Sequence, residues 1–395
     1  MKKIAYLLTG AFMIASCAGQ DDGKPVDQNA TPETVNLYRN LFLIAEKGFM
    51  FGHEDDLAYG VGWWAEEGRS DVKETAGSYP AVYGWDLGDI GAERNLDSVL
   101  FDDMVRWIRE VYERGGINTI SWHLDNPVSG GSSWDKTPAV KAILPGGEKH
   151  AEYLRSLNLV ADFFDKLRSG DKKIPIVFRP FHEHNGDWFW WGKGNCEESD
   201  YIELWKFTAG YLKNERKINH LLYAFSPDRS RMDLSTGQAS YFWGYPGDEY
   251  VDIIGLDNYW DVGSTYNKKT VEESKPELVQ SLEMISEIAR EKNKPAALTE
   301  TGNEALTIDQ WYTKVLLQPV KENRERIRIG WALVWRNARP DHMYAPHPGH
   351  PSAADFLEFR NDPIVFFEDD IEGIYAGKVK IIKQEERPAS AAQTE

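Results

Sequence analysis

Two glutamates, Glu183 and Glu300, each follow a short apolar run that is typical of a buried β-strand. A carboxylate placed directly after a hydrophobic strand is costly to bury unless it has a partner or a chemical task. Where the strands belong to a barrel, the residues at their C-terminal ends are usually catalytic. Two carboxyl groups brought together in this way form the pair that glycoside hydrolysis requires.

Eight short apolar runs recur along the chain, and most gaps between them fit an amphipathic helix. Apolar strands that alternate with helices are typical of a parallel sheet covered on both faces. We therefore expect an α/β fold, a (β/α)8 TIM barrel with long loops at its C-terminal face. The expected strands are 49–53, 79–87, 117–124, 174–182, 220–226, 251–259, 295–301 and 327–335.

The fourth run ends in a segment that carries several functional side chains. Period-two alternation would place Arg179, Phe181 and Glu183 on one face of the strand and His182 on the other. An inward Arg179 would tune the nearby carboxylates. A general acid must keep its proton near neutral pH, and repulsion from Glu300 would raise the pKa of Glu183.

Glu300 would act as the nucleophile only if hydrogen-bond donors stabilise its charge. Tyr259, at the end of the preceding strand, is a candidate donor. Asp257 lies two residues earlier and shares a strand face with Tyr259, so it too is expected to face the site.

Aromatic residues are frequent, with 15 Trp, 18 Tyr and 17 Phe, and many stand close to polar side chains that could bind sugar hydroxyls. Flanking glycines mark 188–191 as a loop, so we expect its tryptophans to be exposed. The formal net charge of -18 argues against nucleic acid and against a polyanionic glycan, and a neutral substrate fits best.

A metal site is an alternative reading of the segment around Glu183. His182 and His184 could ligate zinc together with His53, His123 or Asp125, which follow other runs. A metal-dependent hydrolase therefore stays open, although the sequence lacks the helical His-Glu-x-x-His motif. The carboxylate mechanism needs no metal and no organic cofactor.

The first residues have the shape of a signal peptide, with Lys2 and Lys3 before an apolar stretch that closes at Cys17. We expect a lipoprotein signal at 1–16, a lipidated Cys17, a tether at 17–32, the catalytic domain at 33–383 and a disordered tail at 384–395. Asp21 and Asp22 resemble a surface-export signal. The expected location is the membrane of a Gram-negative cell, with the cell surface favoured over the periplasm.

Four motifs resemble glycoside hydrolase family 26, whose members are mostly β-mannanases. They are the run from Arg179 to Gly192, Phe51-Gly52-His53-Glu54-Asp55-Asp56, Gly255-Leu256-Asp257-Asn258-Tyr259 and Thr299-Glu300-Thr301-Gly302. The resemblance implies a (β/α)8 barrel with a retaining mechanism. The family's acid/base ends strand four and its nucleophile ends strand seven, which agrees with the positions of Glu183 and Glu300.

Carried over, the resemblance makes Glu183 the acid/base, Glu300 the nucleophile, Tyr259 its support and His182 the residue that orients the sugar near its 2-hydroxyl. The residues implied to bind substrate are His123, Arg179, His182, Trp188, Asp257, Tyr259, Trp335 and Arg336. Glu54 departs from the family, where glutamine is common, and its role stays open.

The expected function is endo-β-1,4-mannanase action on mannan, galactomannan or glucomannan by double displacement. The protein would be a monomer that meets the membrane only through its lipid. The alternatives are an exo-acting, mannobiose-releasing enzyme, a β-glucanase or β-1,3-xylanase of the same family, and a non-catalytic glycan-binding lipoprotein.

Overall fold

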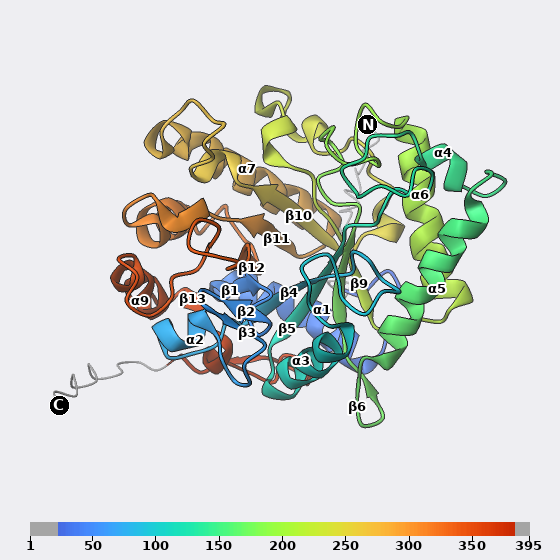
Figure 1. Ribbon diagram of the computed structural model, residues 1–395. Helices are drawn as coiled ribbons and strands as arrows, with labels where there is room; N and C mark the ends of the chain where they lie inside the picture. Colours follow the sequence, from blue (N-terminus) through green and yellow to red (C-terminus); the bar gives the residue numbers. More distant parts are fainter. Residues whose placement is uncertain (1–22, 384–395) are drawn as a thin grey trace, which may run out of the picture.

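The predicted barrel is present in the computed structural model, which describes residues 23–383 (Figure 1). Eight parallel strands follow one another around a closed sheet, and the last of them pairs with the first. They are β1 (Phe49–Glu54), β4 (Val82–Asp86), β5 (Ile117–Trp122), β8 (Ile176–Pro180), β9 (Leu221–Phe225), β10 (Ile253–Asn258), β11 (Ala296–Thr301) and β12 (Trp331–Val334). Each overlaps one predicted apolar run, so the predicted (β/α)8 fold is confirmed.

Helices surround these strands (Figure 1). They are α1 (Pro32–Lys47), α2 (Asp71–Ala76), α3 (Phe101–Arg114), α4 (Val140–Ile143), α5 (His150–Lys166), α6 (Glu198–Gly210), α7 (Val271–Lys292), α8 (Gln318–Glu322) and α9 (Ala353–Asn361). Helix α7 begins with a capping box, in which Thr270 and Glu273 satisfy each other's backbone N–H groups. Single π-helical turns follow α6, at Tyr211–Glu215, and precede α8, at Trp311–Leu317.

Short elements complete the chain between the barrel units. The small strands are β2 (Tyr59–Gly60), β3 (Trp63–Trp64), β6 (Arg168–Ser169), β7 (Lys172–Lys173), β13 (Val365–Phe366), β14 (Ile371–Glu372) and β15 (Lys380–Ile381). The 3₁₀ turns are Arg229–Arg231, Leu234–Ser240, Asp248–Tyr250, Trp260–Val262, Glu304–Leu306 and Glu368–Asp370. Strand β13 pairs in parallel with the start of β1, and β2 with β3 forms a hairpin.

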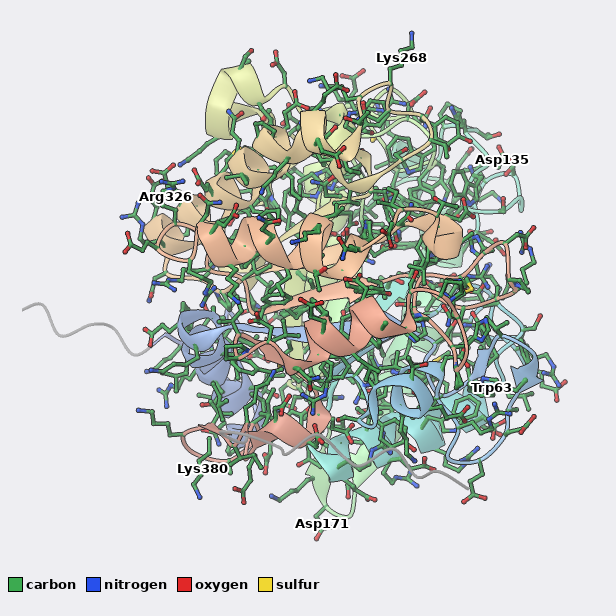
Figure 2. All side chains as sticks on the ribbon, turned by 90° about the vertical axis from the view of Figure 1, so that its left-hand side faces the viewer. Trp63, Asp135, Asp171, Lys268, Arg326 and Lys380 are labelled. Atoms are coloured by element: carbon green, nitrogen blue, oxygen red, sulfur yellow. The ribbon has the colours of Figure 1, made fainter. Side chains whose placement is uncertain are left out.

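The apolar core lies in two places. One part fills the barrel with one side chain from most strands, and α1 joins this cluster through Leu37, Leu41 and Ile44. The other part packs between the strands and the outer helices, and Phe51 and Trp85 belong to it. Alternate residues of each strand therefore point inward and outward. Charged side chains cover the outside, as Asp171, Lys268, Arg326 and Lys380 show (Figure 2).

The second half of the predicted tether, residues 23–31, packs against the protein. The backbone N–H of Val26 donates to Asp252 Oδ1 at 2.7 Å, and Asn219 Nδ2 donates to the carbonyl of Asn29 at 2.9 Å. The predicted signal peptide 1–16, the lipidation site Cys17 and the tail 384–395 lie outside the described residues. Within residues 23–383, no helix has the length and apolar character needed to span a bilayer.

Candidate active site

Glu300 lies near the end of β11 and is 5% exposed. The pairing of β10 with β11 shifts by one residue there, so that Asp257 stands opposite Glu300 while Thr299 Oγ1 still donates to Asp257 Oδ1 at 2.7 Å. Tyr259 Oη donates to Glu300 Oε1 at 3.0 Å, and Arg179 Nη2 donates to Glu300 Oε2. Tyr259 is thus the donor that the sequence suggested.

Arg179, on β8, donates hydrogen bonds to side chains at the ends of three other strands. Its Nη1 donates to Asp257 Oδ2 at 2.7 Å and to Ser226 Oγ at 3.2 Å, while its Nη2 holds Glu300. The guanidinium side chain is only 4% exposed. A buried charge needs hydrogen-bonded partners, and here its charged partners are two carboxylates. The two arms of the guanidinium therefore fix the carboxylates of β10 and β11 relative to β8.

Glu183 does not continue the alternation of β8, and that prediction was wrong. The strand ends at Pro180, and Phe181 and Glu183 adopt left-handed φ angles of 52° and 53°. Phe181 therefore turns away from Arg179 and packs in the outer core with Trp190, at a ring separation of 6.5 Å. A left-handed φ is costly for any residue other than glycine. Such strained conformations cluster at functional sites.

The carboxyl group of Glu183 belongs to a half-buried residue in an acidic environment. Burial raises its pKa well above the usual range, and Asp228 and Glu300 add to the effect, whereas Arg179 opposes it. The predicted repulsion by Glu300 is thus present, but burial is the larger cause. Trp188 Nε1 donates to Glu183 Oε2 at 2.8 Å.

Two histidines meet beside this pair. The rings of His123 and His182 lie 4.6 Å apart, edge to face. His123 Nδ1 contacts Asp86 Oδ2 at 2.7 Å, and this carboxylate outweighs burial and raises the pKa of His123. Burial, with the charge of Arg179, lowers the pKa of His182 well below its usual value. His123 therefore carries a proton more readily than His182.

Trp335 and Arg336 follow β12 and complete the group of predicted residues. The Trp335 ring lies 6.5 Å from that of His123. Arg336 Nη1 lies 2.6 Å from Asp97 Oδ1 and donates to Tyr59 Oη at 3.2 Å. The predicted site residues thus all come from C-terminal strand ends or from the loops that follow them.

The expectation that the whole 188–191 loop is exposed was wrong. Trp190 and Trp191 are fully buried, and only Trp188 is partly accessible. Trp190 Nε1 donates to the carbonyl of Leu124 at 2.8 Å, and Trp191 Nε1 donates to that of His182 at 3.0 Å. These two tryptophans therefore stabilise the backbone around the site through buried hydrogen bonds.

Two acidic residues of the site were left out of the predicted set. Asp86 orients His123, and Asp228 acts on the pKa of Glu183. Both follow apolar runs, as the predicted residues do, and this position is the signal by which they could have been found.

His184, one histidine of the zinc alternative, has partners of its own away from the pair of His123 and His182. His184 stacks on Tyr201, and its Nε2 lies 3.0 Å from the carbonyl of Trp243. Burial lowers the pKa of His184 to about 3. In the part of the chain that the structure describes, no three or more His, Cys, Asp or Glu side chains are grouped as a metal site.

The carboxyl groups of Glu183 and Glu300 lie in different electrostatic environments. One carboxyl group, that of Glu183, tends to keep its proton, while the other, that of Glu300, sits among cationic and hydroxyl donors. Two carboxyl groups in such different environments can divide the work of acid and nucleophile in acetal hydrolysis.

Comparison with known families gives a match to the model described as Glycosyl hydrolase family 26, over residues 26–307. Among solved structures, a GH26 beta-mannanase from Bacteroides ovatus is 39% identical, with a TM-score of 0.81 over 90% of this chain and 100% of that one. An endo-beta-1,4-mannanase from Cellulomonas fimi is 34% identical, with a TM-score of 0.81 over 89% of this chain and 79% of that one.

Two relatives are each named mannan endo-1,4-beta-mannosidase. The protein from Bifidobacterium adolescentis is 34% identical over 286 residues, which cover 70% of this chain but only 27% of that longer protein. The protein from Bacillus subtilis strain 168 is 29% identical over 318 residues, which cover 76% of this chain and 78% of the relative.

Proposed function

The chain belongs to glycosyl hydrolase family 26, and on that premise we propose that it is an endo-β-1,4-mannanase acting on mannan, galactomannan or glucomannan. The pair Glu183 and Glu300 carries the proposal, because its two members differ in the way that acid and nucleophile must differ. The substrate class is supported by relatives that carry the mannan endo-1,4-beta-mannosidase name.

The proposed mechanism is double displacement. Glu183 gives its proton to the departing glycosidic oxygen while a carboxylate oxygen of Glu300 attacks the anomeric carbon. Water then attacks the glycosyl ester, and Glu183, now ionised, removes a proton from that water. This chemistry retains the anomeric configuration and requires the two carboxyl groups to lie roughly 5 Å apart.

Arg179 and Tyr259 would hold Glu300 in the orientation for attack and stabilise its charge before the bond forms. Asp257 would keep Arg179 in place.

The remaining predicted residues would bind the sugar. His123 and His182 would meet hydroxyl groups, Trp188 and Trp335 would stack on apolar sugar faces, and Arg336, held by Asp97 and Tyr59, would contact a more distant unit.

We also propose that the protein is a monomeric lipoprotein attached through Cys17 to a Gram-negative membrane, on the cell surface rather than on the periplasmic side. The support is the signal-like stretch before Cys17 and the acidic pair Asp21 and Asp22 after it. Protease treatment of intact cells tests the surface location, since a periplasmic protein would survive it.

Product analysis tests the activity. Linear mannan, galactomannan and mixed-linkage β-glucan are incubated with the wild type, Glu183→Ala and Glu300→Ala. A ladder of manno-oligosaccharides that both substitutions abolish supports the proposal. Mannobiose alone from the first minutes would make the enzyme exo-acting, and cleavage of the glucan alone would overturn the substrate. Binding without cleavage would point to a glycan-binding protein.

A further inference from the structure

Glu54 is a buried carboxyl group that the proposed mechanism leaves unused. It ends β1, is 3% exposed, and lies on the inward face of the strand with Met50. Its place depends on a glycine of the neighbouring strand β4. A Cβ atom at Gly84 would come within 1.6 Å of Glu54 Oε2, so the carboxyl group fills the space that a side chain there would need.

The charged groups that act on Glu54 are mostly acidic. They are Asp55 on its own chain segment, Glu300 on β11, Asp86 on β4 and, with the opposite effect, Arg179 on β8. Burial is the largest influence, and together with these carboxylates it raises the pKa of Glu54 well above its usual value, against the opposing charge of Arg179.

Within the described residues, Glu54 forms no ion pair with Arg179. Both terminal nitrogens of Arg179 already donate to carboxylates, Nη1 to Asp257 and Nη2 to Glu300. Asp86 is bound to His123. Within the described residues, Glu54 Oε1 is buried without a hydrogen-bond partner. A buried, unpaired carboxylate is strongly disfavoured, whereas a protonated carboxyl group is far cheaper to bury.

We propose that Glu54 works as an uncharged carboxylic acid, a positioning residue whose neutrality leaves the guanidinium of Arg179 committed to Glu300 and Asp257. An ionised Glu54 would add a third carboxylate around one guanidinium and would weaken its hold on Glu300. The inference rests on the proposed function, in which Glu300 must be oriented for attack.

Thermal stability across pH tests the protonation state without any substrate. If folding raises the pKa of Glu54, the folded protein keeps a proton that the unfolded chain releases above about pH 4.5, and the wild type loses stability as pH rises toward the folded pKa. Glu54→Gln has no such proton. Its Tm relative to wild type should therefore increase steadily with pH, whatever constant offset the substitution adds.

Glu203→Gln, an exposed substitution on α6, is the matched control and should show a Tm difference that does not vary with pH. If Glu54 were instead an ionised partner of Arg179, the Tm difference of Glu54→Gln would become more negative as pH rises. That trend would overturn the proposal.

Kinetics on mannan test the positioning role. Glu54→Met, which has a similar shape but no polar group, should lower kcat on the order of tenfold with little change in KM, and Glu54→Gln should recover most of this loss. The acidic and alkaline limits of the pH profile of kcat/KM should be the same in Glu54→Gln as in the wild type. A shift of both limits to lower pH would contradict a neutral Glu54, because it would mean that a nearby negative charge had been removed.

The two experiments separate this inference from the proposed function. A wild type without mannanase activity would overturn the proposed function and with it the positioning role, whereas the thermal series would still decide whether Glu54 is charged.

Discussion

Trp188 Nε1 donates a hydrogen bond of 2.8 Å to Oε2 of Glu183, five residues earlier in the chain. Burial raises the pKa of Glu183, while a donor to its carboxylate favours the ionised form and works in the opposite direction. The proposed acid/base must be a proton donor in one step and an acceptor in the next. The indole donor therefore limits how far burial can shift this group toward permanent protonation.

Replacing Trp188 by Phe removes the donor and keeps an aromatic ring. Without that donor the pKa of Glu183 should rise further, so the alkaline limit of kcat/KM should move to higher pH. The measurement is a pH profile on a manno-oligosaccharide. Trp134→Phe, at a side chain that is 59% exposed, is the control and should leave the limit in place. A limit that moved to lower pH in Trp188→Phe would contradict the role of the bond.

Tyr259→Phe removes the hydroxyl donor to Glu300. We expect kcat to fall on the order of 10²-fold, because a donor aimed at the reacting carboxylate acts on the transition state, while KM changes little. Steady-state kinetics measure both constants. Tyr266→Phe, at a side chain that is 86% exposed, serves as the matched control. Full activity in Tyr259→Phe would mean that Arg179 alone supports Glu300.

Arg179→Lys keeps the positive charge but loses the fork that reaches Asp257 and Glu300 together. The variant should lose on the order of 10²-fold in kcat. Losing one charge-assisted hydrogen bond should also cost about 1–3 kcal/mol of unfolding free energy. Denaturant unfolding and kinetics on the same preparation test both effects. An active, equally stable Lys variant would show that a point charge is sufficient at this position.

The proposed chemistry uses only side chains, so extended dialysis against a chelator should leave the rate of mannan hydrolysis unchanged. The zinc alternative predicts the opposite result. Activity that disappears on chelation and returns with added zinc would revive the reading in which His182 and His184 bind metal.

The strands and the two glutamates could be predicted because their signals are local. A parallel strand that is buried on both faces is a continuous apolar run, as in 174–178 and 295–298, and a barrel brings the residues after such runs together. The sequence therefore predicts, without any knowledge of side-chain contacts, that Glu183 and Glu300 lie at the same end of the barrel.

The errors began where backbone geometry departs from the regular strand. Nothing in the residue types around Phe181 and Glu183 indicates a left-handed φ, yet these two residues break the alternation and decide which way each side chain points. Trp190 and Trp191 were misplaced for a related reason. Glycines correctly marked a loop, but the loop folds back and buries both rings in the core.

Labelling of the nucleophile tests directly whether Glu300 forms the glycosyl ester. A 2-fluoro mannobioside with an activated leaving group slows hydrolysis of the glycosyl ester, so the intermediate accumulates and can be located by peptide mass spectrometry. We predict one added mannobiosyl group per protein, attached to Glu300, and no label in Glu300→Ala. A label on another residue, or turnover of the wild type with inverted stereochemistry, would contradict it.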